Sequence, residues 1–312
     1  MKTKFAIGCL VQWYECNMIR EYVDSLKDAL TAYDGQVIID FTVVCNEELE
    51  QCISVDQKDE CLHKIAEVVD AVGGNVKFTD DLHTIADYRR EFNTNYCDQV
   101  DVLIWGESDA ILPKQIFVVQ DSLHQQVCKE TPKYLSFFAT CKMWDDSWKS
   151  IEHVDLTDKE RDTLAWYGSS YVMSKDEMNK LNDKVEELDV RVVSPHKFNG
   201  CGLIISSEVI KAGVNIPKSV FFTHEDTAFQ HMTNRVLGNI PQYVIKNILL
   251  VHNRQHPNKR SYVKNEEGPT IKDRRMSNKW YEVAGKMSEH NAYNLFNNVK
   301  SYSWEDVWNQ IN

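Results

Sequence analysis

Several features that mark common classes of protein are missing from this 312-residue chain. No apolar stretch reaches the roughly 18 residues that a membrane-spanning helix needs. The opening residues, MKTKFAIGCLVQWYECN, carry charge too early for a secretory signal peptide. The nine cysteines include no CxxC pair, which argues against a structural zinc site. An odd number of cysteines without a secretion signal indicates reduced thiols, so we expect a cytoplasmic protein with no transmembrane segment.

The signatures of two large enzyme classes are missing as well. No G-x-G-x-x-G follows the first apolar run, which argues against a hydride-transferring enzyme, and the chain has no P-loop. Positive charge is scarce, because 35 Lys and Arg stand against 47 Asp and Glu, a formal net charge of −12. This excess of negative charge argues against nonspecific binding to nucleic acid or to a membrane surface, and it is compatible with a local basic patch.

What the chain does contain is an alternation of buried strands and helices. Apolar runs typical of buried strands lie at 4–14 and 37–46, a short strand is expected at 76–80, and the next strand at 100–107. Helical patterns lie between them, at 16–33, 59–72 and 83–97. Strands that alternate with helices predict an α/β fold with a mostly parallel central sheet and right-handed crossovers.

The second half of the chain has a less regular pattern. Strand-like runs lie at 134–144 and 247–254, a polar helix is predicted at 175–188, and 198–213 joins a glycine turn to a strand and a helix. An aromatic helical segment, YSWEDVWNQI, closes the chain. No internal repeat or low-complexity linker separates these segments, so we expect one domain with a C-terminal extension.

Two carboxylates stand at the end of the strand predicted at 100–107. Glu107 and Asp109 are separated by one residue, and Pro113 follows at the first turn of an expected helix. Ligands of open parallel sheets bind at the carboxyl ends of the strands, which is where these acids fall. Carboxylates at this spacing can converge on one divalent cation, and oxygen ligands suit Mg²⁺ or Mn²⁺. An exposed pair of surface acids is the simpler alternative.

Other polar residues follow the same arrangement. The helix IADYRREFN offers Arg89 and Arg90, FFTHEDTAFQHM carries the acid pair Glu225-Asp226, and NILLVHNR ends a buried strand at His252. Each has a structural alternative. The arginines fit a solvated helix face, the acid pair fits a helix N-terminus favoured by the dipole, and the histidine fits an ordinary strand end.

The order of these motifs resembles that of glycosyltransferases with the GT-A fold, in the style of family 2. The resemblance rests on the R-x-x-x-N helix, the acid-x-acid-x-x-L-P stretch, N-G-C-G-L-I-I-S, H-E-D-T-A-F and the late V-H, and spans about 4–256. It implies a Rossmann-like GT-A sandwich with a small antiparallel portion beside the parallel sheet. It also implies a catalytic domain at 1–256, with a nucleotide-binding half (1–115), an acceptor half (116–256) and a helical extension at 257–312.

The resemblance assigns roles to particular residues. Glu107 and Asp109 match the metal-binding motif, although the family usually has Asp where this chain has Glu107. His252 matches a late histidine ligand, with His256 as the alternative. Asp226 matches the acid that removes a proton from the acceptor hydroxyl, with Glu225 as its orienter or as an alternative base. The residues expected to bind the donor are Gln12, Trp13, Asn46, Arg89, Arg90, Ser108, Gly200 and Gly202.

The leading hypothesis is therefore a hexosyl- or pentosyltransferase that uses Mn²⁺ or Mg²⁺. It would move a sugar from a nucleotide-diphosphate sugar to the hydroxyl of a saccharide, a lipid-linked glycan or modified DNA, with inversion. A second hypothesis makes hydroxymethylated DNA bases the acceptor, with the basic stretch 253–275 along the phosphate backbone. A third makes the chain a nucleotidyltransferase or a non-catalytic nucleotide-binding module. It is disfavoured because no Gly-rich basic loop follows the first strand.

Overall fold

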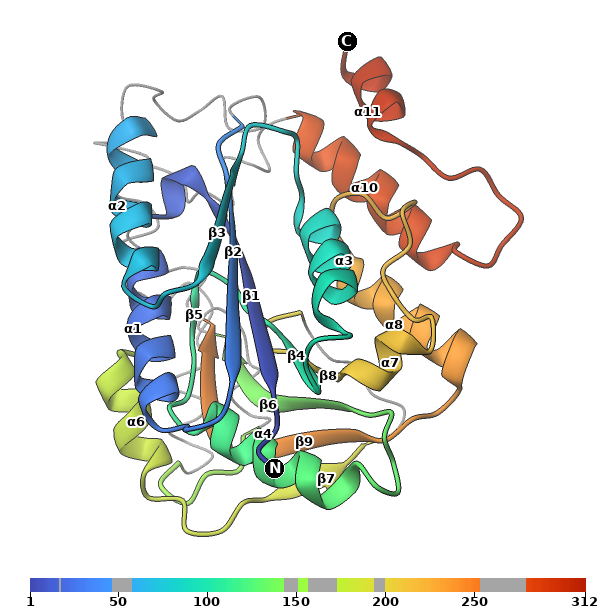
Figure 1. The fold of residues 1–312 in the computed structure, drawn as a ribbon. Helices are drawn as coiled ribbons and strands as arrows, with labels where there is room; N and C mark the ends of the chain where they lie inside the picture. Colours follow the sequence, from blue (N-terminus) through green and yellow to red (C-terminus); the bar gives the residue numbers. More distant parts are fainter. Residues whose placement is uncertain (17, 47–57, 143–150, 157–172, 194–199, 253–278) are drawn as a thin grey trace.

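The computed structural model describes residues 1–16, 18–46, 58–142, 151–156, 173–193, 200–252 and 279–312. In these residues nine strands form one sheet, in the order β3-β2-β1-β4-β8-β6-β9-β5, with β7 paired to β9. Helices cover both faces of the sheet, with α1 and α2 on one side and α3 and α8 on the other (Figure 1). The fold class expected from the sequence, α/β with a mostly parallel sheet and a smaller antiparallel part, is confirmed.

The parallel half of the sheet follows the predicted alternation closely. Its strands are β1 (Phe5–Gln12), β2 (Val37–Val44), β3 (Asn75–Thr79) and β4 (Val102–Trp105). The helices between them are α1 (Met18–Thr31), α2 (Lys58–Asp70) and α3 (Ile85–Tyr96), and a 3₁₀ turn, η1 (Trp13–Glu15), follows β1.

The apolar run of β1 is continuous because both faces of this strand are covered. Phe5, Ile7 and Val11 belong to one hydrophobic cluster, whereas Ala6 and Leu10 belong to the other. Successive strand residues point to opposite faces, so a strand between two helix layers needs apolar residues at every position.

The second half of the sheet mixes both strand directions. Its strands are β5 (Ala110–Ile111), β6 (Leu135–Lys142), β7 (Val190–Val192), β8 (Ile204–Ser206) and β9 (Gln242–His252). β8 runs antiparallel to β4 and β6, β9 runs parallel to β6, and β5 and β7 run antiparallel to β9. The helices of this half are α4 (Ile116–Val127), α6 (Lys175–Asn182), α7 (Ser207–Lys211) and α8 (Glu225–Leu237).

Two predicted boundaries are wrong. Pro113 does not open a helix, because Ile111 belongs to β5 and α4 begins only at Ile116. The helix predicted at 175–188 ends at Asn182, whose side-chain amide is bound to the backbone of β9. Its Nδ2 donates to the carbonyl of Leu249 at 3.0 Å, and its Oδ1 accepts from the Leu249 N–H at 2.7 Å.

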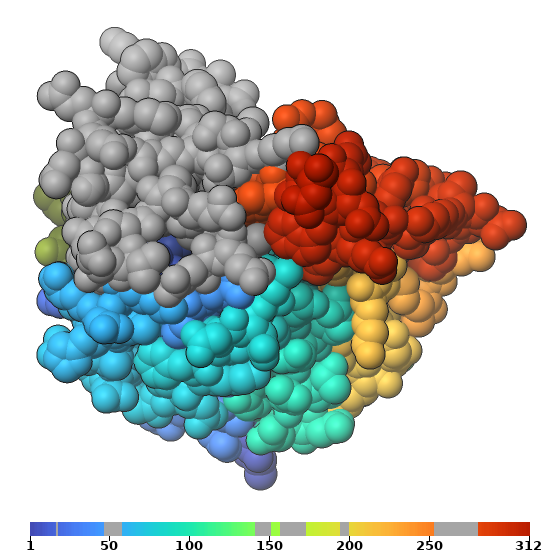
Figure 2. Space-filling view, turned by 90° about the horizontal axis from the view of Figure 1, so that it is seen from above, coloured from blue at the N-terminus to red at the C-terminus, as the bar shows by residue number. Residues whose placement is uncertain are grey.

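The C-terminal helices pack beside the sheet on the connection that leads into α8. They are α10 (Lys279–Tyr293) and α11 (Trp304–Ile311), and they share an aromatic cluster with Phe221 and Phe222. Figure 2 shows these red residues gathered beside the yellow segment that precedes α8. None of the helices in the described ranges is both long enough and apolar enough to span a bilayer.

Ser288 of α10 binds the backbone just before α8. Its Oγ accepts from the N–H groups of Phe222 at 3.3 Å and Thr223 at 3.2 Å, and it donates to the Thr223 carbonyl at 2.7 Å. The side chain is fully buried, so these hydrogen bonds are protected from water. Helix α10 therefore fixes the peptide unit that precedes His224 and the acid pair.

Candidate active site

Strand pairing between β4 and β8 sets one side of the candidate site. Ile104 pairs with Ile204, and the ladder continues where the Gly202 N–H donates to the Trp105 carbonyl at 2.9 Å. The Trp105 N–H also donates to the Leu203 carbonyl at 2.9 Å, so the turn that carries Cys201 lies beside the end of β4. The first predicted acid therefore leaves β4 beside the turn that enters β8.

The short strand β5 sets the other side. Ala110 pairs with His252 at the end of β9, which brings the preceding residue, Asp109, next to the histidine. Nε2 of His252 lies 3.1 Å from Oδ1 of Asp109 and 2.8 Å from Oε2 of Glu107. The structure thus brings together the three side chains that the sequence analysis assigned to a metal.

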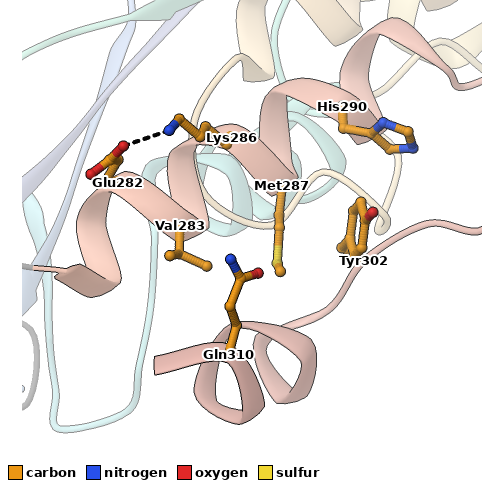
Figure 3. Close-up of a pocket in the computed structure, with 7 residues that line it drawn as sticks. All are labelled: Glu282, Val283, Lys286, Met287, His290, Tyr302 and Gln310. Carbon is orange, nitrogen blue, oxygen red and sulfur yellow. Dashed lines mark hydrogen bonds and ion pairs between the residues drawn. The ribbon is translucent and has the colours of Figure 1, made fainter. Parts of the chain in front are cut away.

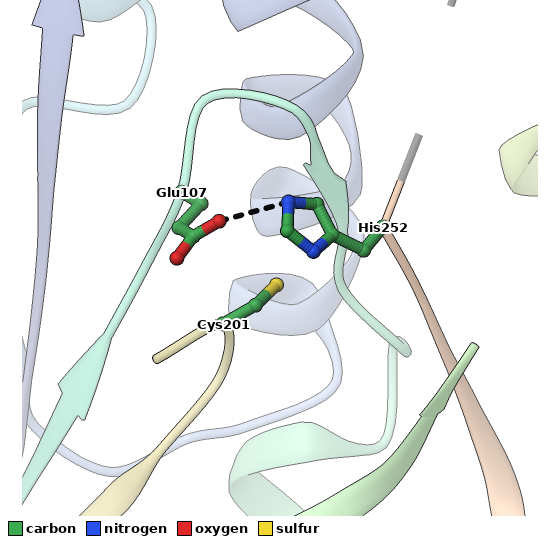
Figure 4. A group of neighbouring side chains, drawn as sticks. All are labelled: Glu107, Cys201 and His252. Atoms are coloured by element: carbon green, nitrogen blue, oxygen red, sulfur yellow. Dashed lines mark ion pairs between the residues drawn. The ribbon is translucent and has the colours of Figure 1, made fainter. Parts of the chain in front are cut away.

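Cys201 completes this group. One oxygen of Glu107, the sulfur of Cys201 and a ring nitrogen of His252 all lie within 4.8 Å of one another. Figure 4 shows the three side chains pointing toward one another from the ends of their strands. Cys201 has no signal in the sequence, because a lone thiol between two glycines carries no ligand spacing.

Arg89 joins this group to the second acid pair. It is 1% exposed, although the sequence left open a solvated helix face. Its Nη2 donates to Glu107 Oε1 at 2.7 Å and to the Gly200 carbonyl at 3.0 Å, and its Nη1 donates to Glu225 Oε1 at 2.5 Å. The guanidinium also lies over the Trp105 ring, 4.7 Å from its centroid. Arg89 is therefore a buried bridge between the two acidic segments.

Glycine is needed at position 200 because Arg89 fills the space beside it. A Cβ at Gly200 would lie 2.1 Å from Nη1 of Arg89, closer than any real contact. Gly202 has φ of +70°, and a Cβ there would lie 2.6 Å from Cδ1 of Leu250. Both glycines predicted to face a donor sugar thus lie against protein side chains.

The acid pair begins α8 at a strained position. His224, the residue before the helix, has φ of 63°, the only positive φ of a non-glycine residue in the described ranges. Such left-handed backbone costs free energy and is concentrated at functional sites. Glu225 is buried against Arg89, whereas Asp226 is only partly buried. Oδ1 of Asp226 accepts from the Thr227 N–H at 2.7 Å, which fixes the orientation of this carboxylate.

These contacts shift three pKa values. Burial raises the pKa of Glu107, but the charge and hydrogen bond of His252 and the charge of Arg89 outweigh it and hold that pKa at about 2. Burial lowers the pKa of His252, yet Cys201, Asp109 and Glu107 together hold it well above its ordinary value. Burial raises the pKa of Glu225 to about 7, despite the opposing charge of Arg89. Glu225 thus titrates near neutral pH.

The raised pKa of Glu225 predicts a pH dependence of stability. Between its ordinary pKa of 4.5 and about 7, the folded chain holds a proton that the unfolded chain has released. The free energy of unfolding should therefore fall as the pH rises through this window, by at most about 1.4 kcal/mol per pH unit. Urea unfolding of chelator-treated protein from pH 4.5 to 7.5 measures this slope. Glu225→Gln should make the slope shallower, and parallel slopes in both proteins would contradict the shift.

The predicted nucleotide-binding residues lie at the ends of β1 and β2. Gln12 is partly buried, Trp13 is 1% exposed in the core, and Nδ2 of Asn46 donates to the Asp80 carbonyl at 2.9 Å. Ser108 donates to Oε2 of Glu15 at 2.7 Å, and the same oxygen accepts from the Gln12 N–H at 3.0 Å. Glu15, which the sequence analysis missed, therefore ties the end of β1 to the loop that holds both acids. The spacing Gln12-x-x-Glu15 of a capping box was its only signal.

Arg90 is not brought to the cluster. Its Nε donates to the Ile216 carbonyl at 2.9 Å, its Nη2 donates to the Val220 carbonyl at 2.8 Å, and its Nη1 pairs with Asp87 at 2.8 Å. The structure uses this arginine to hold the loop before α8. His256 and the basic stretch 253–275 lie outside the described residues.

The donor atoms around His252 fit a divalent cation. Glu107 and Asp109 offer carboxylate oxygens, His252 an imidazole nitrogen and Cys201 a sulfur. Oxygen and nitrogen donors accept Mg²⁺, Mn²⁺ and Zn²⁺, and a sulfur donor favours the softer of these ions. Protonated His252 places one positive charge between the carboxylates of Glu107 and Asp109. A bound divalent cation would place two positive charges there.

A separate pocket lies away from these residues. It has a volume of about 470 Å³ and is lined by α10, α11 and Tyr302 (Figure 3). None of the residues assigned to metal, donor or acceptor lines it. We assign the candidate active site to the cluster around His252, because Glu107 meets the imidazole and the thiol there and Arg89 links Glu107 to Glu225.

Comparison with known proteins gives similarity of structure alone. No protein-family model and no curated protein matches the sequence. Among solved structures, S. aureus TarS is 12% identical with a TM-score of 0.45, covering 80% of this chain and 36% of its own. TarS 1–349 in complex with UDP-GlcNAc is 11% identical with a TM-score of 0.45, and the match covers 96% of this chain and 68% of the TarS chain. GalNAc-T7 with UDP, GalNAc and Mn²⁺ is 11% identical with a TM-score of 0.47, and the match covers 99% of this chain and 57% of the GalNAc-T7 chain. This chain thus spans about a third of TarS, and similarity at this level adds no argument about activity.

Proposed function

We propose that the chain is a metal-dependent glycosyltransferase with a GT-A fold. It transfers a hexose or pentose from a nucleotide-diphosphate sugar to an acceptor hydroxyl, with inversion. The observation that carries the proposal is the convergence of Glu107, Asp109 and His252 at the ends of β4 and β9, with Arg89 linking them to the pair that begins α8. Strand ends of an α/β sheet are where such folds bind nucleotides.

The metal-binding part of the mechanism is assigned to the cluster around His252. Glu107, Asp109 and His252 would hold Mn²⁺ or Mg²⁺, with the imidazole neutral and both carboxylates ionised. When bound, the cation neutralises charge that develops on the departing diphosphate. Glu15 and Ser108 keep the acid-bearing loop against the end of β1, and so align the cation site with the nucleotide wall that Gln12 and Asn46 are proposed to form.

The proton-transfer part is assigned to the acid pair. Asp226 is proposed to take the proton of the acceptor hydroxyl, because it keeps partial exposure while the Thr227 N–H orients it. Glu225 is proposed as a positioning residue, because Arg89 binds it at 2.5 Å inside the protein. The same arginine binds Glu107, so the two parts of the site share one rigid link.

Loss of Asp109 tests the metal-binding half of this proposal. In the wild type, one member of a panel of UDP-, GDP- and dTDP-sugars should raise the melting temperature with Mn²⁺ and fail to do so in chelator. Asp109→Asn should abolish this rise, because it removes a charged oxygen ligand 3.1 Å from His252. Transfer should fall by more than the roughly 10- to 100-fold typical of losing an outer-shell partner of a metal.

The matched control is Asp98→Asn, which removes the same charge from an exposed position. It should leave both the metal-dependent shift and the transfer rate at the wild-type level. Undiminished transfer by Asp109→Asn in the presence of chelator would exclude the proposed mechanism.

A further inference from the structure

The thiol of Cys201 lies inside the cluster of Glu107 and His252 without a role in the mechanism proposed so far. Cys201 is 2% exposed, and its sulfur lies within 4.8 Å of donor atoms of both neighbours. Figure 4 shows the sulfur directed toward the gap between the carboxylate and the imidazole.

The backbone on both sides holds Cys201 in this position. Before it, the Gly200 carbonyl accepts from Arg89 at 3.0 Å. After it, the Gly202 N–H donates to Trp105 at 2.9 Å, and Leu250 fills the space beside Gly202. A thiol fixed between two anchored glycines is preorganised toward its neighbours, as ligands of tight metal sites are.

We propose that Cys201 is a direct ligand of the divalent cation, together with Glu107, Asp109 and His252. The set of two oxygens, one nitrogen and one sulfur matches the number and kinds of ligand that Zn²⁺ takes in proteins, and Co²⁺ accepts the same donors. A buried sulfur is a poor ligand for Mg²⁺, which prefers oxygen and keeps several waters. The site therefore selects Zn²⁺ and Co²⁺ over Mg²⁺ and, of the two cations proposed for transfer, Mn²⁺ over Mg²⁺.

Binding changes the protonation of two side chains. The sulfur of Cys201 releases its proton to solvent, as does Nε2 of His252, so that both lone pairs face the cation. The proposal rests on the proposed function only in placing a cation at this cluster. It holds equally for an acceptor of any chemical class.

Cobalt is the probe that reports a sulfur ligand directly. Co²⁺ titrated into chelator-stripped, full-length protein should give a thiolate-to-cobalt charge-transfer band in the near ultraviolet. Cys201→Ser and Cys201→Ala should bind Co²⁺ without this band, and their Zn²⁺ affinity should fall at least roughly tenfold in a competition titration. Their Mg²⁺ affinity should change less than about twofold, because Mg²⁺ makes no use of the sulfur.

The control is Cys128→Ser, which changes a partly buried thiol that terminates α4 outside the cluster. It should keep the band, and thermal unfolding of the metal-free variants shows whether any of them is simply misfolded. Cobalt binding without the band in the wild type, or a band that survives in Cys201→Ala, overturns the proposal. If the band is missing but Mn²⁺-dependent transfer still requires Asp109, the proposed function stands and Cys201 is not a ligand. If the band is present but no donor supports transfer, Cys201 is a ligand and the proposed function fails.

Discussion

Asp226→Asn is expected to lower kcat of sugar transfer by roughly a hundredfold to ten-thousandfold, the range for loss of a general base. The amide keeps the shape of the carboxylate, and its oxygen still accepts from the Thr227 N–H. It cannot take a proton from the acceptor hydroxyl. Binding of Mn²⁺ and donor should change less than about threefold, because the ligands around His252 are untouched. Initial rates under donor saturation, with a thermal-shift titration of the donor, measure both quantities.

Two further variants sharpen this test. Glu225→Gln should reduce kcat less than Asp226→Asn does, because Glu225 is bound to Arg89 and acts by holding the segment in place. Glu186→Gln removes a charge from an exposed position and should have no effect. If Asp226→Asn keeps more than a tenth of the wild-type kcat, Asp226 is not the base. If Glu225→Gln shows the larger loss, the two roles must be exchanged.

Arg89→Met is expected to cost about 3–5 kcal/mol of folding free energy, the usual result of removing one partner from a buried ion pair. The substitution leaves Glu107 and Glu225 without the cation that binds both of them, and the Gly200 carbonyl without its donor. Arg89→Lys should lose a smaller amount, because a single ammonium cannot span both carboxylates and the carbonyl. Urea unfolding monitored by circular dichroism gives the free energies.

A compensating variant tests whether the loss comes from charge. Neutralising both carboxylates in the Arg89→Met background, with Glu107→Gln and Glu225→Gln, should recover a large part of the lost stability, because no buried charge is then left unpaired. Arg235→Met is the surface control. Its guanidinium lies 5.4 Å from the Phe296 ring at an exposed position, and its loss should cost less than about 1 kcal/mol. A loss below 1 kcal/mol in Arg89→Met would show that the bridge is not what holds the acids.

The parallel half of the sheet was predictable because each of its elements has a clear period. β1 and β2 are buried on both faces and read as apolar runs, and the helices between them show a stripe of apolar residues. β5 left no such signal, because two residues cannot display a period. This short strand is the element that carries Asp109 to His252, so the sequence predicted which residues meet but not how they are brought together.

The burial of Arg89 could have been predicted, and that of Cys201 could not. Arg89 lies three residues after Ala86 and four before Asn93, on the stripe of α3 that faces the sheet. The helical period therefore placed a charge in the interior, which requires an opposite charge nearby. Cys201 reaches the site through the antiparallel register of β4 and β8, and strand register between distant segments has no local signature.

The hydrogen bonds of Ser288 set an order of events during synthesis on the ribosome. The strands and the segment around Thr223 leave the exit tunnel before α10 does, and domains begin to fold as they emerge. The nascent chain can thus build its sheet while the turn ahead of Glu225 still lacks its partner. The backbone ahead of the acid pair can gain its hydrogen bonds to Ser288 only after α10 has been made.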